Sequence, residues 1–164
     1  MKQIGFLAVF LLVLATSCRN KTSVSEQSNA LFYAVSSVVD GDTFWLDDGS
    51  EKGLKVRLIG VNAPESRATG RKVKEDFGME AKHFLTGLLH KKRVRLEYDV
   101  DKTDPYGRAL AYVYLEDGTF LNAYLVEQGY AHVATYPPNV RYVEVFKKLE
   151  QTARKKKRGL WKAR

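Results

Sequence analysis

Apolar and polar positions alternate along several short stretches between residues 31 and 115, which is the pattern of half-buried β-strands. In one of them Val94 and Leu96 alternate with Arg93 and Arg95. Turn-forming sequences separate the stretches, including Asp40 to Thr43 and Asp47 to Gly49. The pattern predicts five strands, at residues 31–39, 43–46, 54–61, 91–99 and 109–115.

Three other segments repeat their apolar residues at helical spacing. The first runs from Glu75 to Leu89, the second opens at Thr119 or Asn122 and ends at Gln128 before Gly129, and the third spans residues 140–157. Three strands, a helix, two strands and two helices suit an α+β, mainly β fold. We expect a five-stranded Greek-key barrel of the oligonucleotide-binding (OB) type with three helices. Periodicity alone does not distinguish this barrel from another α+β packing.

The N-terminus has the pattern of an export signal. Residues 1–17 combine Lys2 with an almost wholly apolar run that is short for a membrane span, so we expect a signal peptide. The small residues before Cys18 resemble a bacterial lipoprotein cleavage box, although Ala15 stands where a leucine is usual. We expect cleavage before Cys18, lipidation of Cys18, a flexible tether over residues 18–30 and a folded domain over residues 31–164. Plain secretion with an unmodified thiol is the alternative.

Composition narrows the choice of partner. The chain has 164 residues, of which 45% are hydrophobic, so one folded domain is expected. Its formal charge of +8 favours anionic partners, namely nucleic acid or an acidic membrane surface. Charge of this kind carries no information about the fold.

Candidate chemistry gathers at the end of the third predicted strand. Arg57, Asn62 and Glu65 follow one another there, and Pro64 ends the strand in a turn. Arg108 stands just before the fifth strand. Two guanidinium groups from different strands can converge on one phosphate and neutralise the charge that builds in a transition state. Taken by itself, the stretch 56–65 is equally consistent with an ordinary strand and turn.

Oxygen atoms near the same strand ends suggest a metal site. The side chains of Asp42 and Asn62 and the carbonyl of Ala63 are ligands that a hard cation such as calcium accepts. No cluster of cysteine and histidine offers a zinc site, and we expect His83, His90 and His132 to be structural or solvated. Tyr106 and Tyr136 are candidates for stacking on a substrate or for hydrogen bonds to phosphate, or alternatively core or rim aromatics.

Three blocks of this sequence, in the same order and at agreeing spacing, resemble the staphylococcal nuclease (thermonuclease) family. They are Val38 to Thr43, Val56 to Glu65, and Asp104 to Tyr112, and the resemblance extends over residues 31–161. It implies an OB barrel with three helices. It also implies calcium-dependent hydrolysis of phosphodiester bonds in DNA and RNA, with 3′-phosphorylated products.

The resemblance assigns roles to particular residues. It implies that Arg57, Glu65 and Arg108 are catalytic, and that Asp42, Asn62 and Ala63 hold Ca²⁺. Asn62 stands where the family has a second metal carboxylate, so the site loses one negative charge and should bind calcium more weakly. Pro105 stands where the family often has a lysine, which puts one phosphate contact in doubt.

We therefore expect an exported monomeric endonuclease, secreted or anchored in the cell envelope by lipid at Cys18. DNA and RNA are the expected partners, with single strands preferred because unstacked bases suit this barrel. The main alternative is a nucleic-acid-binding lipoprotein on the same fold that has weak or no catalysis, which Asn62 would favour. A third reading, a structural lipoprotein held to anionic lipids by its charge, leaves the three blocks unexplained.

Overall fold

The computed structural model describes residues 31–68 and 75–162, and the predicted signal peptide, tether and Cys18 lie outside the described residues. The strands are β1 (Tyr33–Asp40), β2 (Thr43–Asp47), β3 (Leu54–Leu58), β4 (Val61–Asn62), β5 (Arg93–Glu97), β6 (Ala109–Leu115) and β7 (His132–Val133). The helices are α1 (Gly78–Leu89), α2 (Leu121–Glu127) and α3 (Val143–Lys155), followed by the short 3₁₀ helix η1 (Gly159–Trp161).

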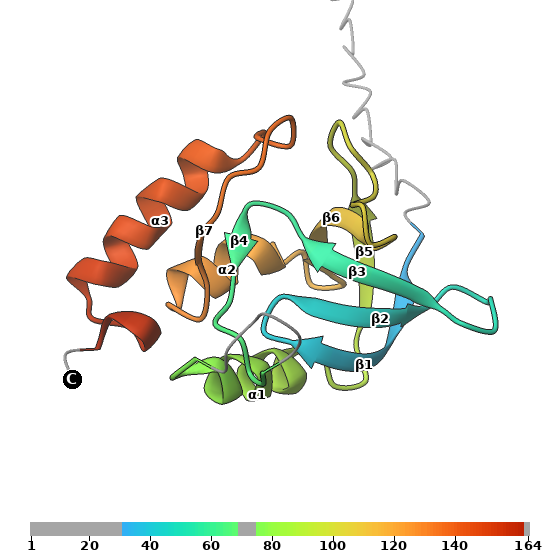
Figure 1. Cartoon of the computed structure of the whole chain (residues 1–164), viewed down its shortest axis with the longest axis horizontal. Coiled ribbons are helices and arrows are strands. Elements are labelled where there is room, and N and C mark those ends of the chain that lie inside the picture. Colours follow the sequence, from blue (N-terminus) through green and yellow to red (C-terminus); the bar gives the residue numbers. More distant parts are fainter. Residues whose placement is uncertain (1–30, 69–74, 163–164) are drawn as a thin grey trace, which may run out of the picture.

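Five of these strands close into a barrel in the order β1-β2-β3-β6-β5 (Figure 1). All neighbours are antiparallel except β3 and β6, which pair in parallel, and β1 closes the barrel by pairing with β5. The short strands β4 and β7 form a separate two-stranded sheet. The barrel and the three helices confirm the predicted OB-type, α+β fold.

Period-two patterning explains which side chains fill the barrel. Phe44 and Leu46 of β2 and Val56 and Leu58 of β3 are at most 2% exposed. Their neighbours along these strands, including Trp45 and Lys55, alternate with them and face outward. Burial of the apolar face is the main favourable term that holds the barrel closed.

The predicted third strand, residues 54–61, is wrong as one continuous element. It stops at Leu58, turns through Ile59 and Gly60, and resumes as β4 at Val61. Gly60 has φ 77°, a left-handed conformation that glycine adopts without steric cost. The apolar run gave no sign of this break because buried residues continue through it.

Two helices begin later than predicted, and three short elements were not predicted at all. Helix α1 begins at Gly78, three residues later than predicted, because Phe77 has φ 71° and cannot continue a helix. Helix α3 starts at Val143 rather than Val140. Strands β4 and β7 and helix η1 were not predicted as elements, since two- or three-residue segments carry almost no periodicity.

The helices pack on the barrel from two sides. Helix α1 lies beneath β1 and β2, whereas α2 passes behind β4 and β7 and packs against α3, which lies beyond them (Figure 1). A cluster of aromatic rings joins the barrel to α3, with Tyr112 and Phe146 fully buried within it. Among the described residues, no helix is both long and apolar enough to cross a membrane.

We expect Gly60→Ala to destabilise the fold strongly. A Cβ atom at residue 60 would lie 2.5 Å from the ring of Phe146, which is fully buried and has no room to move. Gly118→Ala is the matched control, because its φ of 85° is similar and nothing lies within 4 Å of the added atom. In urea unfolding, Gly118→Ala should cost about 1–2 kcal/mol, and Gly60→Ala about 1–3 kcal/mol more, from overpacking. Equal losses in the two variants would contradict the close packing at Gly60.

Candidate active site

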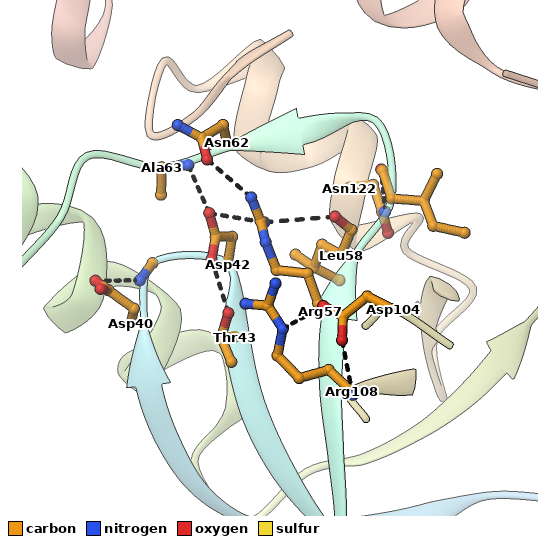
Figure 2. Close-up of polar contacts among 12 residues, drawn as sticks. Asp40, Asp42, Thr43, Arg57, Leu58, Asn62, Ala63, Asp104, Arg108 and Asn122 are labelled. Carbon is orange, nitrogen blue, oxygen red and sulfur yellow. Dashed lines mark hydrogen bonds and ion pairs between the residues drawn. The ribbon is translucent and has the colours of Figure 1, made fainter. Parts of the chain in front are cut away.

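The guanidinium of Arg57 is held by three acceptors at the end of β3 (Figure 2). Its Nη1 lies 2.7 Å from Oδ2 of Asp42, and its Nη2 donates to Oδ1 of Asn62 at 2.8 Å. A longer bond of 3.4 Å reaches the carbonyl of Leu58. The side chains of Arg57 and Asp42 are only 12% and 9% exposed, so solvent screens this ion pair little. Three of the five N–H groups of the arginine are used here, and two are left to face an anion.

The turn between β3 and β4 brings Asn62 to Arg57. Gly60 makes this turn, and the buried amide of Asn122 fixes it by donating to the carbonyls of Ile59 at 2.9 Å and Ala111 at 3.3 Å. The amide oxygen of Asn122 accepts the N–H of Val113 at 2.9 Å. Asn122 thus satisfies three backbone groups where the strand breaks, and unpaired groups there would be costly.

A tight turn before β6 positions Arg108. The carboxylate of Asp104 accepts the backbone N–H groups of Tyr106 and Arg108 at 2.9 and 3.0 Å, and it also pairs with Nε of Arg108. Gly107 completes the turn with φ 75°. Burial acts to raise the pKa of Asp104, but the hydrogen bonds and charge of Arg108 outweigh it, so this pKa lies below its usual value. Asp104 is therefore a carboxylate that orients Arg108.

Two adjoining hollows open around these arginines. One, of about 360 Å³, is lined by Asn62 and Tyr136 among others, and the second, of about 600 Å³, is lined by Asp42 and Glu65. Arg57, Tyr106 and Arg108 line both. Asp42 and Glu65 thus line the larger hollow, whereas Asn62 lines the smaller one, and Arg57 contacts both Asp42 and Asn62.

Glu65 is attached through its backbone to the start of α1. Its carbonyl accepts the N–H of Glu75 at 3.0 Å. Gly78 packs so closely on this carbonyl that a Cβ atom at residue 78 would collide with it. The position of Glu65 at the rim of the larger hollow therefore depends on the glycine that begins α1.

The predicted oxygen ligands lie near one another but differ in exposure and in their hydrogen-bond partners. Oδ2 of Asp42 accepts the N–H of Ala63 at 2.8 Å, and its Oδ1 accepts the hydroxyl of Thr43 at 2.9 Å. Ala63 is 3% exposed and lines neither hollow. Over residues 31–68 and 75–162, no group of three or more histidine, cysteine, aspartate or glutamate side chains is arranged to hold a metal.

The two predicted tyrosines lie at the mouth of the site. Tyr106 is 85% exposed and Tyr136 is 68% exposed. The guanidinium carbon of Arg108 lies 5.5 Å from the ring centre of Tyr106. Of the histidines set aside from the sequence, His83 and His90 are exposed, and His132 stands opposite Asn62 on β7 without lining either hollow.

Sequence reasoning missed several residues of the site. The four-residue spacing of Asp104 and Arg108 within one turn was an available signal. Lys55 and Arg67, which line the larger hollow, and Asn122, a polar residue within an apolar helix pattern, were also missed. Nothing in the sequence tells which backbone groups Asn122 meets, because they come from other strands.

Comparison with known proteins identifies the family of this chain. Residues 55–163 match the family model described as staphylococcal nuclease homologue. The chain belongs to the staphylococcal nuclease family. The match includes Arg57, Asn62, Glu65 and Arg108, and it continues through the three helices.

Several curated relatives resemble the chain over most of its length. It is 42% identical to a thermonuclease of Staphylococcus intermedius, over 79% of this chain and 75% of that protein. It is 38% identical to a thermonuclease of Staphylococcus hyicus, over 86% of this chain and 82% of that protein. Endonuclease YncB of Bacillus subtilis is 35% identical over 75% of this chain, which spans 58% of that protein. As a member of the family, the chain is a hydrolase of the phosphodiesterase class, a nuclease.

Proposed function

We propose that this chain is a calcium-dependent endonuclease that hydrolyses phosphodiester bonds of DNA and RNA and leaves 3′-phosphate ends. The observation that carries the proposal is the pair of anchored arginines. Arg57 lies on β3 and Arg108 in the turn before β6, each is bound to its own carboxylate, and both border the hollow that Glu65 lines. Fixed donors of this kind need no reorganisation when charge develops on a phosphoryl group.

The donor set is compatible with a hard cation. Oδ2 of Asp42 and Oδ1 of Asn62 already converge on one cationic group, the guanidinium of Arg57. Carboxylate and amide oxygens are ligands that calcium accepts, and water completes its coordination. We propose that Asp42, Asn62 and the carbonyl of Ala63 hold Ca²⁺. When bound, the ion supplies Lewis-acid polarisation of the phosphate and neutralises negative charge.

In the proposed mechanism, each side chain has a separate role. Arg57 and Arg108 bind the non-bridging oxygens of the scissile phosphate through their remaining N–H groups. Glu65 orients a water molecule and accepts its proton as the water oxygen attacks phosphorus in line. The bond from phosphorus to the 5′-oxygen breaks, and this oxygen takes a proton from solvent water and leaves as a hydroxyl group, so the phosphate stays on the 3′ side.

The two exposed tyrosines complete the proposed substrate site. Tyr106 and Tyr136 stand at the mouth of the hollows, where the face of an unpaired base can stack on a ring. Single strands are therefore the preferred substrate in this proposal. We also propose export, with lipid attached at Cys18, on the basis of the N-terminal sequence pattern alone.

We expect the purified full-length chain to cleave denatured DNA when calcium is present and to stop when a chelator removes it. Product ends should carry 3′-phosphate, read by their failure to be extended by a polymerase until a phosphatase has acted. Binding of DNA without cleavage at millimolar calcium would instead support the alternative function, a nucleic-acid-binding lipoprotein. Asn62 is the observation that favours that alternative, since it leaves Asp42 as the one charged ligand.

Glu65→Gln should reduce turnover by a factor on the order of 10² or more if Glu65 accepts the proton of the attacking water. The amide keeps the shape of the side chain, so affinity for oligonucleotide should change little. Glu144→Gln removes the same charge from the exposed face of α3 and should leave turnover unchanged. Near-normal turnover of Glu65→Gln would exclude this residue as the general base.

Asn62→Asp should tighten calcium binding, because affinity in such sites rises with the number of charged ligands. Isothermal titration of the metal into the free protein measures this without relying on cleavage. Asp42→Asn, which removes the one charged ligand of the wild-type site, should weaken binding. Unchanged or weaker calcium binding by Asn62→Asp would argue against Asn62 as a ligand.

A further inference from the structure

Lys55 lies on the same outward face of β3 as Arg57, two residues before it. Both side chains alternate with the buried residues Val56 and Leu58, and both line the larger hollow. Residues two apart along a strand are separated by about 7 Å, which is comparable to the spacing of successive phosphates in a nucleic-acid strand. Lys55 therefore presents a cation one phosphate away from Arg57.

Trp45 supports the ammonium group of Lys55 from the neighbouring strand. The two residues pair directly across β2 and β3, in the register that also pairs Thr43 with Arg57. The ammonium nitrogen of Lys55 lies 5.5 Å from the centre of the indole ring, and both side chains are half-buried. Across the described ranges, 31–68 and 75–162, Lys55 forms no ion pair, so its positive charge is not neutralised by a neighbouring carboxylate.

We propose that Lys55 and Trp45 form a subsite for the nucleotide next to the scissile phosphate. The ammonium of Lys55 binds the phosphate of that nucleotide, and the indole of Trp45 stacks on its base. A basic group beside an aromatic face is the combination that binds single-stranded nucleic acid without reading its sequence. This inference rests on the proposed nuclease function, because Arg57 defines where the scissile phosphate lies.

The subsite extends by one nucleotide only. Beyond Trp45, β2 ends in the hairpin that carries Asp47, Asp48 and Glu51, all of them exposed. Lys52 offsets only one of these three negative charges. A further phosphate along this path would meet like charge, which disfavours its binding.

The test uses trinucleotides in which one of the two phosphodiester linkages is a neutral methylphosphonate. The neutral linkage is not cleaved, so it fixes the scissile bond and removes the charge of the adjacent phosphate. The two isomers carry the neutral linkage on opposite sides of the scissile bond. For the isomer whose neutral linkage occupies the proposed subsite, the wild-type KM should be about tenfold higher than for cleavage of the same bond in the natural trinucleotide. Lys55→Gln should raise KM for the natural substrate by a similar factor, leave kcat nearly unchanged, and show no further loss with that isomer.

Two controls separate a subsite from a general effect of charge. Lys148→Gln removes one positive charge from the exposed face of α3, on the far side of β4 and β7, and should not alter the effect of the neutral linkage (Figure 1). An abasic nucleotide in the proposed position should weaken binding to the wild-type protein, and Trp45→Leu should abolish that difference, whereas Trp45→Phe should retain part of it.

The result that overturns the proposal is a loss of the same size for Lys55→Gln on natural and neutral-linkage trinucleotides, or equal losses for Lys55→Gln and Lys148→Gln. If instead the proposed nuclease function is wrong, the wild-type protein will cleave no trinucleotide, which distinguishes that failure from failure of the subsite. In that case the same set of oligonucleotides, titrated by fluorescence of Trp45 in a Trp161→Phe protein, still tests whether Lys55 binds the adjacent phosphate.

Discussion

The ion pair between Arg57 and Asp42 is the interaction on which the site depends. It joins the start of β2 to the end of β3, and through Asn62 it reaches β4. Removing two charges from water costs several kcal/mol per ion, and only good geometry with further hydrogen bonds compensates for this cost. The bonds to Asp42 from Ala63 and Thr43 supply that compensation. A binding group held in this way is already oriented before a substrate arrives.

A break in the barrel creates the space in which this pair works. Had β3 continued through Gly60, Asn62 would have followed Arg57 along the barrel wall. The left-handed turn at Gly60 and the buried amide of Asn122 instead fold β4 back against β7. Phe146 packs where a side chain at residue 60 would stand, so helix α3 stabilises the same turn. The same residues therefore determine both the core packing and the geometry of the site, so a substitution that disturbs the packing also disturbs the site.

The strands of the barrel were predictable from the sequence because they have clear alternation, as in Phe44 and Leu46 or Val56 and Leu58. The choice of an OB barrel came from the order of the elements and from the family resemblance, not from this periodicity. The gathering of Arg57 and Arg108 was predictable because both stand at strand ends that the OB topology brings together. The break at Gly60, the late start of α1 at Gly78 and the β4–β7 pair were not predictable, since they are decided by backbone geometry and distant contacts. For the same reason the sequence did not indicate the role of Asn122, whereas Asp104 had a local signal in its spacing from Arg108.

The pairing of each arginine with its own aspartate also sets how the site attracts a substrate. Arg57 with Asp42 and Arg108 with Asp104 are formally neutral pairs, so in the proposed function the hollow holds a phosphate through oriented N–H groups more than through net charge. The chain's formal charge of +8 comes from residues elsewhere, whose field acts over a longer range and brings a polyanion to the surface. Salt screens that long-range attraction between exposed charges but screens the part-buried pairs much less. Under the proposed function, capture of the strand and orientation of its phosphate are thus carried out by different sets of charges. In our proposal Lys55 belongs to both sets of charges. It forms no ion pair among the described residues, and it lines the same hollow as Arg57.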